Sequence, residues 1–159
     1  MGSQSTTHFA YIAGFLDGDG SLMLQVKKRK DGNLGHRFMV TICFYQDSRH
    51  EQPLMWIQKR IKIGYISRRN DGITELRING FQQVARILKK LLPYIRFKKI
   101  QARAIYKAAI LLSQKGELRL IPREKRYLVD LILSVQQQNY VTRRKKTKDE
   151  LYEVLGLTP

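Results

Sequence analysis

The chain has 159 residues, 43% of them hydrophobic, which is enough to bury one core of ordinary size. It carries 30 lysines and arginines against 13 aspartates and glutamates, and the resulting formal charge of +17 indicates a polyanionic partner. Cys43 is the only cysteine, so the sequence excludes a disulfide framework and a cysteine-based zinc site. No apolar span reaches membrane length, which excludes a membrane span and leaves nucleic acid as the expected polyanionic partner.

The N-terminal segment is polar and leads into a helix. MGSQSTTH lacks the charged start and the apolar stretch of a secretory signal, so we expect an intracellular protein, of an organelle or of a prokaryotic or archaeal cytoplasm. The residues that follow favour a helix at 7–16, with Thr6 or Thr7 as its N-cap. Glycines at positions 18 and 20 are expected to end it.

A β-hairpin is predicted next, because the hydrophobic period changes to two. In SLMLQVKKRK, apolar residues at 22, 24 and 26 alternate with mostly polar and basic ones, and DGNLG at 31–35 is typical of a turn. HRFMVTICFYQ continues the alternation. Its apolar face consists of Phe38, Val40, Ile42 and Phe44.

The rest of the chain repeats helix and hairpin and then adds further helices. Pro53 suits the first turn of an amphipathic helix, and residues 70–72 (Asn-Asp-Gly) form a hairpin turn. The predicted elements are, in chain order, a helix at 53–61, strands at 65–69 and 73–78, helices at 81–92, 99–112 and 122–138, a charged linker at 142–148 and a short helix at 149–157. This order predicts an α+β domain whose antiparallel sheet is covered by helices on one side.

The other face of the predicted sheet would be strongly basic. It gathers Gln25, Lys27, Arg29, Arg37, Ser67, Arg69 and Arg77, with only Asp31 and Glu75 as acids. For a single strand, a solvated polar face would be the better interpretation. Because all four strands share one sign of charge, we favour a nucleic-acid platform, since a β-ribbon fits the major groove and long side chains reach base edges.

Two neighbouring carboxylates, Asp17 and Asp19, stand out in this basic chain. They lie in IAGFLDGDG at 12–20, and one interpretation is that they stabilise a turn, because turns select Asp and Gly. The alternative rests on the small residues at 10, 14 and 18, which form one helical stripe and allow another helix to approach closely. Such a helix pair would bring carboxylates together at its tip.

At these residues the sequence resembles the LAGLIDADG homing endonucleases, because IAGFLDGDG at 12–20 matches, position by position, the nine-residue motif that gives the family its name. The order of helices and hairpins matches the family's repeating unit, and PYIRFKKIQA at 93–102 is similar to its lysine-bearing segment. The resemblance implies an αββαββα core with a four-stranded antiparallel saddle sheet and additional C-terminal helices. We expect one domain over 1–159, with this core at about 7–113 and the C-terminal helices and basic linker at 114–159.

The resemblance also implies an activity. Family members with one motif are homodimers that cut both strands of a long, near-palindromic DNA target by metal-dependent phosphodiester hydrolysis, which promotes mobility of their host intron or intein. The resemblance implies that Asp19 and the Gly18 carbonyl bind the metal. It also implies that Gln46 and Lys98 are catalytic residues together with Asp19. Asp17 would brace the helix pair. The expected dimer interface consists of Ala10, Ala13, Gly14 and Asp17.

The metal expected at this site is Mg²⁺, because it prefers oxygen ligands and keeps several waters. Mn²⁺ is expected to substitute, and Ca²⁺ to bind without supporting cleavage. The expected DNA contacts are Met23, Gln25, Lys27, Arg29, Arg37, Thr41, Ser67, Arg69, Glu75, Arg77 and Lys99. The basic run at 143–146 is interpreted as a linker, or as a tail that follows the DNA backbone.

Two other functions fit the same scaffold. An RNA maturase that assists intron splicing would also have a strongly basic surface, with intron RNA as its partner. A non-catalytic DNA-binding regulator would need the basic sheet without the chemistry. Joint presence of Asp19, Gln46 and Lys98 favours the endonuclease over the regulator.

Overall fold

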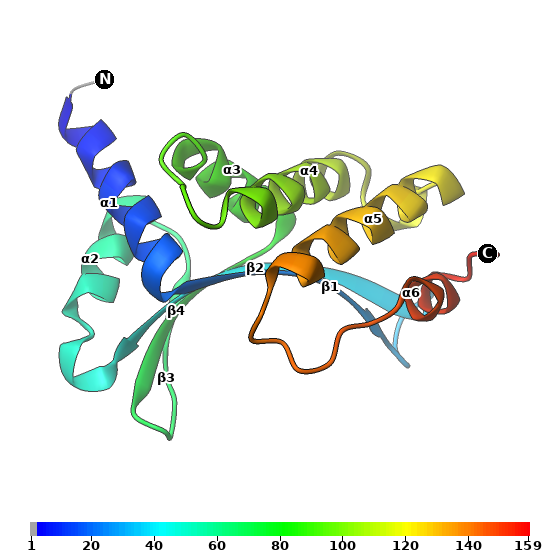
Figure 1. Cartoon of the computed structure of the whole chain (residues 1–159), viewed down its shortest axis with the longest axis horizontal. Coiled ribbons are helices and arrows are strands. Elements are labelled where there is room, and N and C mark those ends of the chain that lie inside the picture. Colours follow the sequence, from blue (N-terminus) through cyan, green and yellow to red (C-terminus); the bar gives the residue numbers. More distant parts are fainter. Residues whose placement is uncertain (1–2) are drawn as a thin grey trace.

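The computed structural model describes residues 3–159 and shows a four-stranded antiparallel sheet with helices packed on one face (Figure 1). Met1 and Gly2, the first residues of the polar N-terminal segment, lie outside the described residues. The elements are α1 (Ser3–Asp19), β1 (Gly20–Lys28), β2 (His36–Asp47), η1 (Ser48–His50), α2 (Gln52–Ile61), β3 (Tyr65–Arg68), β4 (Ile73–Asn79), α3 (Phe81–Leu91), α4 (Lys99–Lys115), η2 (Glu117–Arg119), α5 (Pro122–Gln138) and α6 (Lys148–Leu155). The predicted α+β class is confirmed.

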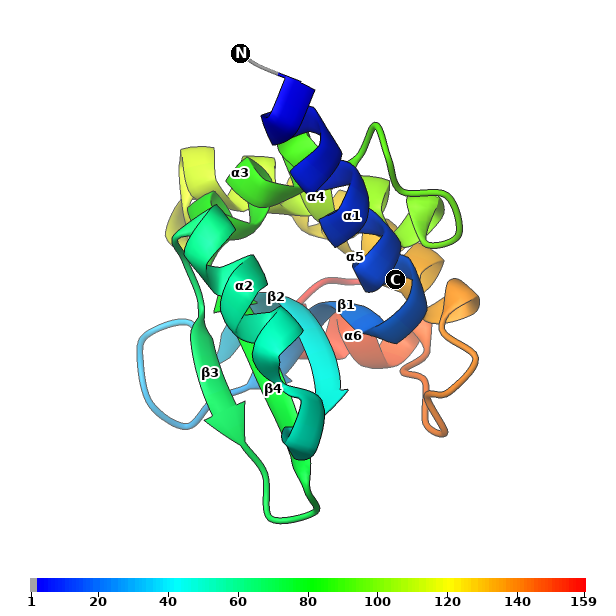
Figure 2. The ribbon, with the colours of Figure 1, turned by 90° about the vertical axis from the view of Figure 1, so that its left-hand side faces the viewer.

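The sheet has the order β1-β2-β4-β3, so the two predicted hairpins join through β2 and β4. Leu24 pairs with Val40 across the first hairpin, and Phe44 pairs with Leu76 across the central strands. All four side chains are at most 3% exposed, which confirms the predicted apolar face. Seen from the side, the β3–β4 hairpin projects away from the helical layer (Figure 2).

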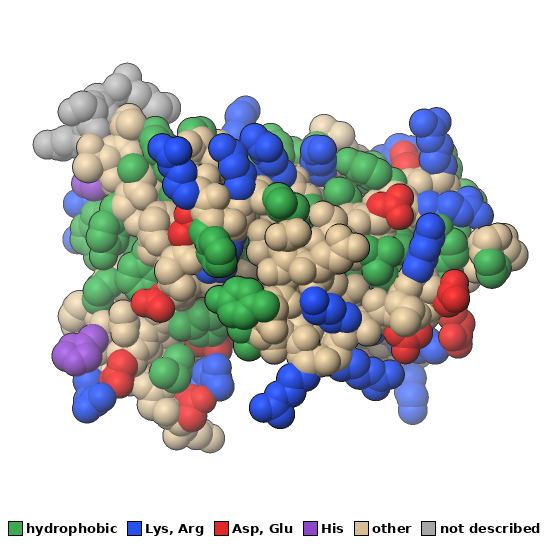
Figure 3. All heavy atoms as spheres, in the orientation of Figure 1, with side chains coloured by type: hydrophobic (Ala, Val, Ile, Leu, Met, Phe, Trp, Pro, Cys, Tyr) green, Lys and Arg blue, Asp and Glu red, His purple; other side chains and the backbone are tan. Residues whose placement is uncertain are grey.

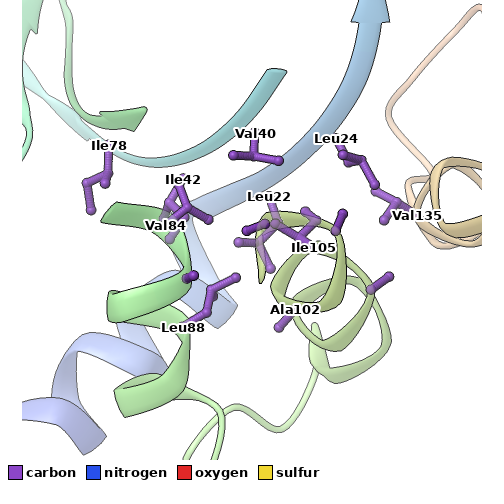
Figure 4. Close-up of a cluster of buried hydrophobic side chains, with 14 of the residues drawn as sticks. Leu22, Leu24, Val40, Ile42, Ile78, Val84, Leu88, Ala102, Ile105 and Val135 are labelled. Carbon is purple, nitrogen blue, oxygen red and sulfur yellow. The ribbon is translucent and has the colours of Figure 1, made fainter. Parts of the chain in front are cut away.

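The core fills the space between this apolar face and the helices (Figure 4). Ile42 of β2 lies against Val84 of α3, and Leu22 of β1 lies beside Ile105 of α4. Farther along β1, the sheet is covered by α5. Because α3, α4 and α5 all pack on the same side, the opposite face of the sheet is left without a helical layer.

Most predicted boundaries agree with the structure within a few residues, but the first helix does not. Helix α1 begins at Ser3, so Thr6 and Thr7 lie inside it and the prediction that one of them is the N-cap is wrong. It also continues through Gly18 to Asp19. A glycine inside a helix costs only about 1 kcal/mol relative to alanine, so contacts elsewhere in the fold can override it.

Within residues 3–159, no helix combines the length and apolar character needed to cross a membrane.

Gly64 is required by the packing of the second hairpin. Its φ is +88°, and an added Cβ would lie 2.7 Å from the Arg77 carbonyl oxygen. Gly72 has a similar φ of +80°, but among the described residues an added Cβ there would meet no atom within 4 Å other than those of its chain neighbours. We expect Gly72→Ala to destabilise the chain by about 1–2 kcal/mol through its backbone alone. Gly64→Ala should cost roughly 1–3 kcal/mol more because backbone must move.

Urea unfolding of both variants at an unchanged m-value measures this difference. Equal midpoints for the two variants would contradict the proposed clash with Arg77.

Candidate functional site

The IAGFLDGDG segment places Asp19 at the junction of α1 and β1. The helix ends at Asp19 and the strand begins at Gly20, with no residue between them. An added Cβ at Gly20 would lie 2.8 Å from the Leu16 carbonyl oxygen, so only glycine permits this direct junction. The Asp19 side chain is consequently exposed at the edge of the sheet.

Asp17, in contrast, is engaged within the chain. Its carboxylate accepts hydrogen bonds from the backbone N–H groups of Arg96 (2.7 Å), Phe97 (3.1 Å) and Lys98 (2.9 Å). These groups lie at the start of α4, where a negative charge also interacts favourably with the positive end of the helix dipole. Asp17 therefore braces α1 against α4, although its partners belong to its own chain and not to a second one.

Lys98 completes this connection from the other side. Its Nζ donates to the carbonyl oxygens of Leu16 (3.0 Å) and Asp17 (2.6 Å), two of the last carbonyls of α1. Burial lowers the pKa of Lys98, while the charges of Asp17 and Asp19 partly oppose this shift. Lys98 thus lies within electrostatic range of the exposed carboxylate.

We expect Asp19→Asn to lower the pKa of Lys98 further, because the substitution removes a negative charge that stabilises the ammonium group. NMR titration of the lysine side-chain carbons would measure the change. Asp130→Asn, at an exposed position of α5, is the matched control and should leave this pKa unaltered. An unchanged or raised pKa of Lys98 in Asp19→Asn would contradict the inferred coupling.

Asp19 and Lys98 line a common groove at the end of β1. The end of α1 and the start of β1 contribute Gly18, Gly20, Ser21, Leu22 and Met23, and β2 contributes Tyr45. The other walls are Phe97 and Gln101 at the start of α4, and Gln138, Asn139, Tyr140, Val141 and Thr142 at the end of α5 and just after it. Inside it, the Ser21 and Tyr45 hydroxyls are 2.9 Å apart and hydrogen-bonded. The alternation of β2 placed Tyr45 on this face, but nothing in the sequence indicated that residues 138–142 would meet Asp19.

The oxygen atoms at this junction fit a magnesium ion only in part. The exposed Asp19 carboxylate and the Gly18 carbonyl, in the last turn of α1, are ligands of the type that magnesium prefers. Within residues 3–159, however, no three His, Cys, Asp or Glu side chains lie close enough together to hold a metal. Further oxygens, from a second chain or from a phosphate, are needed to complete the coordination.

Gln46 lies at the same end of the sheet as Asp19 but does not line the groove. Gly20 pairs with Phe44, so Gln46 is two residues past the junction. Its side-chain Oε1 accepts a hydrogen bond from the Asp47 N–H group at 2.9 Å. The structure thus brings Asp19 and Lys98 together and leaves Gln46 at the groove's periphery.

The open face of the sheet is basic, and its lysines and arginines lie along the lower side of Figure 3, with a second row above the helices. Five predicted contacts are exposed, namely Gln25, Lys27, Arg29, Arg37 and Arg69. Met23, Ser67 and Arg77 are half-buried, and so is Lys99, which begins α4 in the helical layer instead of on this face.

Thr41 and Glu75 differ from the other predicted contacts because they are only 4% and 6% exposed. The Thr41 hydroxyl donates to the Asn79 side-chain oxygen at 2.8 Å. Glu75 accepts from Arg69 (3.0 Å) and Arg77 (3.3 Å), so its carboxylate orients both arginines. These two residues hold neighbouring side chains in place within the described chain.

Comparison with known proteins places these features in a family. The model of the LAGLIDADG endonucleases matches residues 12–110, which include the motif, both hairpins and Lys98. The chain belongs to the LAGLIDADG endonuclease family.

Curated relatives of this LAGLIDADG chain include the DNA endonuclease I-CvuI of Chlorella vulgaris, 35% identical over 61% of this chain and 60% of its own length. The DNA endonuclease I-CreI of Chlamydomonas reinhardtii is 27% identical over 61% of this chain and 59% of its own. The matched segment thus spans about 60% of the length of these relatives.

Solved structures extend the likeness to nearly the whole chain. I-CvuI in complex with the I-CreI target, in the presence of Mg, has a TM-score of 0.86 at 26% identity, covering 98% of this chain and 96% of that one. The archaeal intron-encoded homing endonuclease I-Vdi141I, complexed with DNA, has a TM-score of 0.80 at 19% identity and covers 94% of this chain and 95% of that one. This second likeness shows the fold alone.

The motif helix of this LAGLIDADG chain has an open outer face. Gly14 and Gly18 are exposed, and within residues 3–159 a Cβ at either position would meet nothing within 4 Å apart from the neighbouring backbone of α1 itself. Ala10 is half-buried on the same stripe. Ala13, another residue of the predicted dimer interface, is completely buried among the core residues of its own chain. It is therefore not part of the exposed face of α1.

Proposed function

We propose that the chain is a site-specific homing endonuclease that cuts double-stranded DNA as a homodimer, through hydrolysis of one phosphodiester in each strand. The observation that carries this proposal is the shared groove of Asp19 and Lys98 at the end of a basic, helix-free sheet face. A carboxylate with few partners beside a lysine is suited to a phosphate and a cation. The DNA complexes of I-CvuI support the substrate class.

The metal we propose is Mg²⁺, which when bound supplies an activated water and stabilises the leaving oxygen of the phosphodiester. Asp19 and the Gly18 carbonyl would hold it, with Asp19 of a second copy. Lys98 would neutralise charge at the phosphate, and Gln46 would orient the attacking water. We further propose that Mn²⁺ substitutes and that Ca²⁺ permits binding without cleavage; I-CvuI has been crystallised with its target in the presence of Ca.

The second copy is expected to pack on the outer face of α1. The fold of the single chain does not require glycine at positions 14 and 18, because a Cβ there would meet no neighbouring element of the described chain. The absence of side chains at these positions would instead allow a second helix to approach closely. A twofold axis there would place two Asp19 residues near each other and two sheets in line. The target should therefore be nearly palindromic.

Sequence selection is assigned to the open sheet face. Arginine and lysine select guanine and glutamine selects adenine, and each good pair contributes about 1–3 kcal/mol of discrimination. Gln25, Lys27 and Arg37 are sufficiently exposed for such contacts. We also propose that residues 1–159 act as one domain. The protein would work where the DNA of its host intron or intein lies, in an organelle or in a prokaryotic or archaeal cytoplasm.

A cleavage selection tests the proposal directly. The protein is incubated with random DNA duplexes and Mg²⁺, and the cut ends are sequenced, with a parallel Ca²⁺ reaction as the control. We expect one enriched, near-palindromic site with Mg²⁺ and none with Ca²⁺. Salt-sensitive binding without any enriched cut site would contradict an endonuclease and indicate a binding protein on the same fold.

A further inference from the structure

The segment between α5 and α6, residues 139–147, is held in place although its sequence is that of a charged linker. We call it the α5–α6 arch. It runs along the outer edge of β1 and is drawn in orange in Figure 1. Gln136 of α5 donates from Nε2 to the Lys146 carbonyl and accepts at Oε1 from the Lys146 N–H group, each at 3.0 Å.

Lys146 also ties the arch to the sheet. Its Nζ donates to the Val26 carbonyl at 2.8 Å, on the outer edge of β1. Val26 lies between Gln25 and Lys27, two of the proposed base contacts. At its other end the arch continues directly from α5, where the Asn139 N–H group donates to the Val135 carbonyl. The arch is therefore fixed at both ends relative to the strand that would face DNA.

Two large apolar side chains at the start of the arch are almost fully exposed. Tyr140 is 80% exposed and Val141 is 78% exposed. Both line the groove that contains Asp19 and Lys98. Because such side chains gain stability when they leave water, adjacent exposed ones at a functional groove indicate a contact surface.

The charge of the neighbouring residues indicates what covers this surface. Arg143, Arg144 and Lys145 follow directly after Thr142 and are exposed, so the partner of the arch is a polyanion. On duplex DNA, the apolar surfaces next to a phosphate are the deoxyribose rings that line the minor groove and the base faces exposed where a base step opens. Apolar side chains that press on a base step there bend the duplex.

We propose that Tyr140 and Val141 form an apolar wedge that packs in the minor groove beside the cut phosphate and holds the DNA bent. This inference rests on the proposed endonuclease function and adds contact residues to its site. The bend would bring the phosphate toward Asp19, while Gln136 acts as a positioning residue through Lys146. Bending costs less free energy where the DNA is flexible, so pyrimidine–purine steps should be favoured at the centre of the target.

The test compares Tyr140→Ala/Val141→Ala with the conservative Tyr140→Phe/Val141→Ile on one duplex, taken from the cleavage selection or, if nothing is cut, from a selection for binding in Ca²⁺. Energy transfer between dyes at the duplex ends reports the bend in Ca²⁺, and single-turnover assays in Mg²⁺ report the rate. We expect the alanine pair to reduce the bend and to slow cutting roughly tenfold or more, with the Kd within about threefold. The conservative pair should behave like the wild type.

Gln136→Ala provides an independent check, since it leaves the wedge intact and frees only the arch. It should reduce the bend in the same direction, by a smaller factor, without changing the oligomeric state. An unchanged bend and rate in the alanine pair would overturn the wedge. So would dissociation of its dimer in sedimentation, which would assign Tyr140 and Val141 to a contact between copies.

The two proposals can fail separately. If the wild-type protein binds and bends DNA but never cuts it, the endonuclease is wrong while the bend comparison still decides the wedge. If the wild type cuts and the alanine pair cuts equally fast with the same bend, only the wedge is wrong.

Discussion

Asp19→Asn is expected to reduce DNA cleavage by about 1,000-fold or more, while DNA binding persists. The substitution removes the charge of the exposed carboxylate at the α1–β1 junction and preserves its size. Asparagine is a poor ligand for a divalent cation, so the groove keeps Lys98 but loses its proposed metal. Binding depends on the basic sheet face, which this change leaves intact.

Single-turnover cleavage in Mg²⁺ and anisotropy binding assays in Ca²⁺ would measure the two effects separately. Asp130→Asn removes the same charge from an exposed position of α5 and should leave both values within about twofold, because surface changes elsewhere have small effects. A rate for Asp19→Asn above one tenth of the wild-type rate would contradict the assignment of Asp19 to the metal.

Asp17→Ala is expected to destabilise the fold, by about 2–4 kcal/mol. Three backbone N–H groups, of Arg96, Phe97 and Lys98, would lose their carboxylate partner at once. Water can reach part of this site, which keeps the loss below the sum of three buried charged hydrogen bonds. The start of α4 would also lose a favourable negative charge.

Urea denaturation measures this loss, and the same experiment on Asp19→Asn gives the matched comparison. Within residues 3–159 the Asp19 carboxylate accepts no hydrogen bond, so its variant should unfold at nearly the wild-type midpoint. A loss below 1 kcal/mol for Asp17→Ala would show that the brace to α4 contributes little. The two carboxylates of one motif are thus expected to divide into a structural and a functional residue.

The candidate site was only partly visible in the sequence. The motif and the lysine segment brought Asp19 and Lys98 to attention, and the structure places both along one groove. The sequence did not show that Asp17 binds the backbone at 96–98, roughly 80 residues away. It also gave no sign that Tyr140 and Val141 would reach the same groove.

Local patterns determined the elements. A period of two specified the apolar faces of β1 and β2, since alternate side chains on a strand must point to opposite sides. Pro122 marked the start of α5, and the predicted helix at 122–138 is the observed one, Pro122–Gln138. These signals involve residues close in the chain, so they survive in the sequence by itself.

Tertiary structure alone decided the end of α1, the burial of Thr41 and Glu75, and the fixed course of the α5–α6 arch. Lys146 and Val26 are 120 residues apart in the sequence, and their contact exists only because α5 docks beside β1. Likewise, α1 continues past Gly18 because its carbonyls meet Lys98. Such contacts depend on how whole elements pack, and no local period or composition encodes that packing.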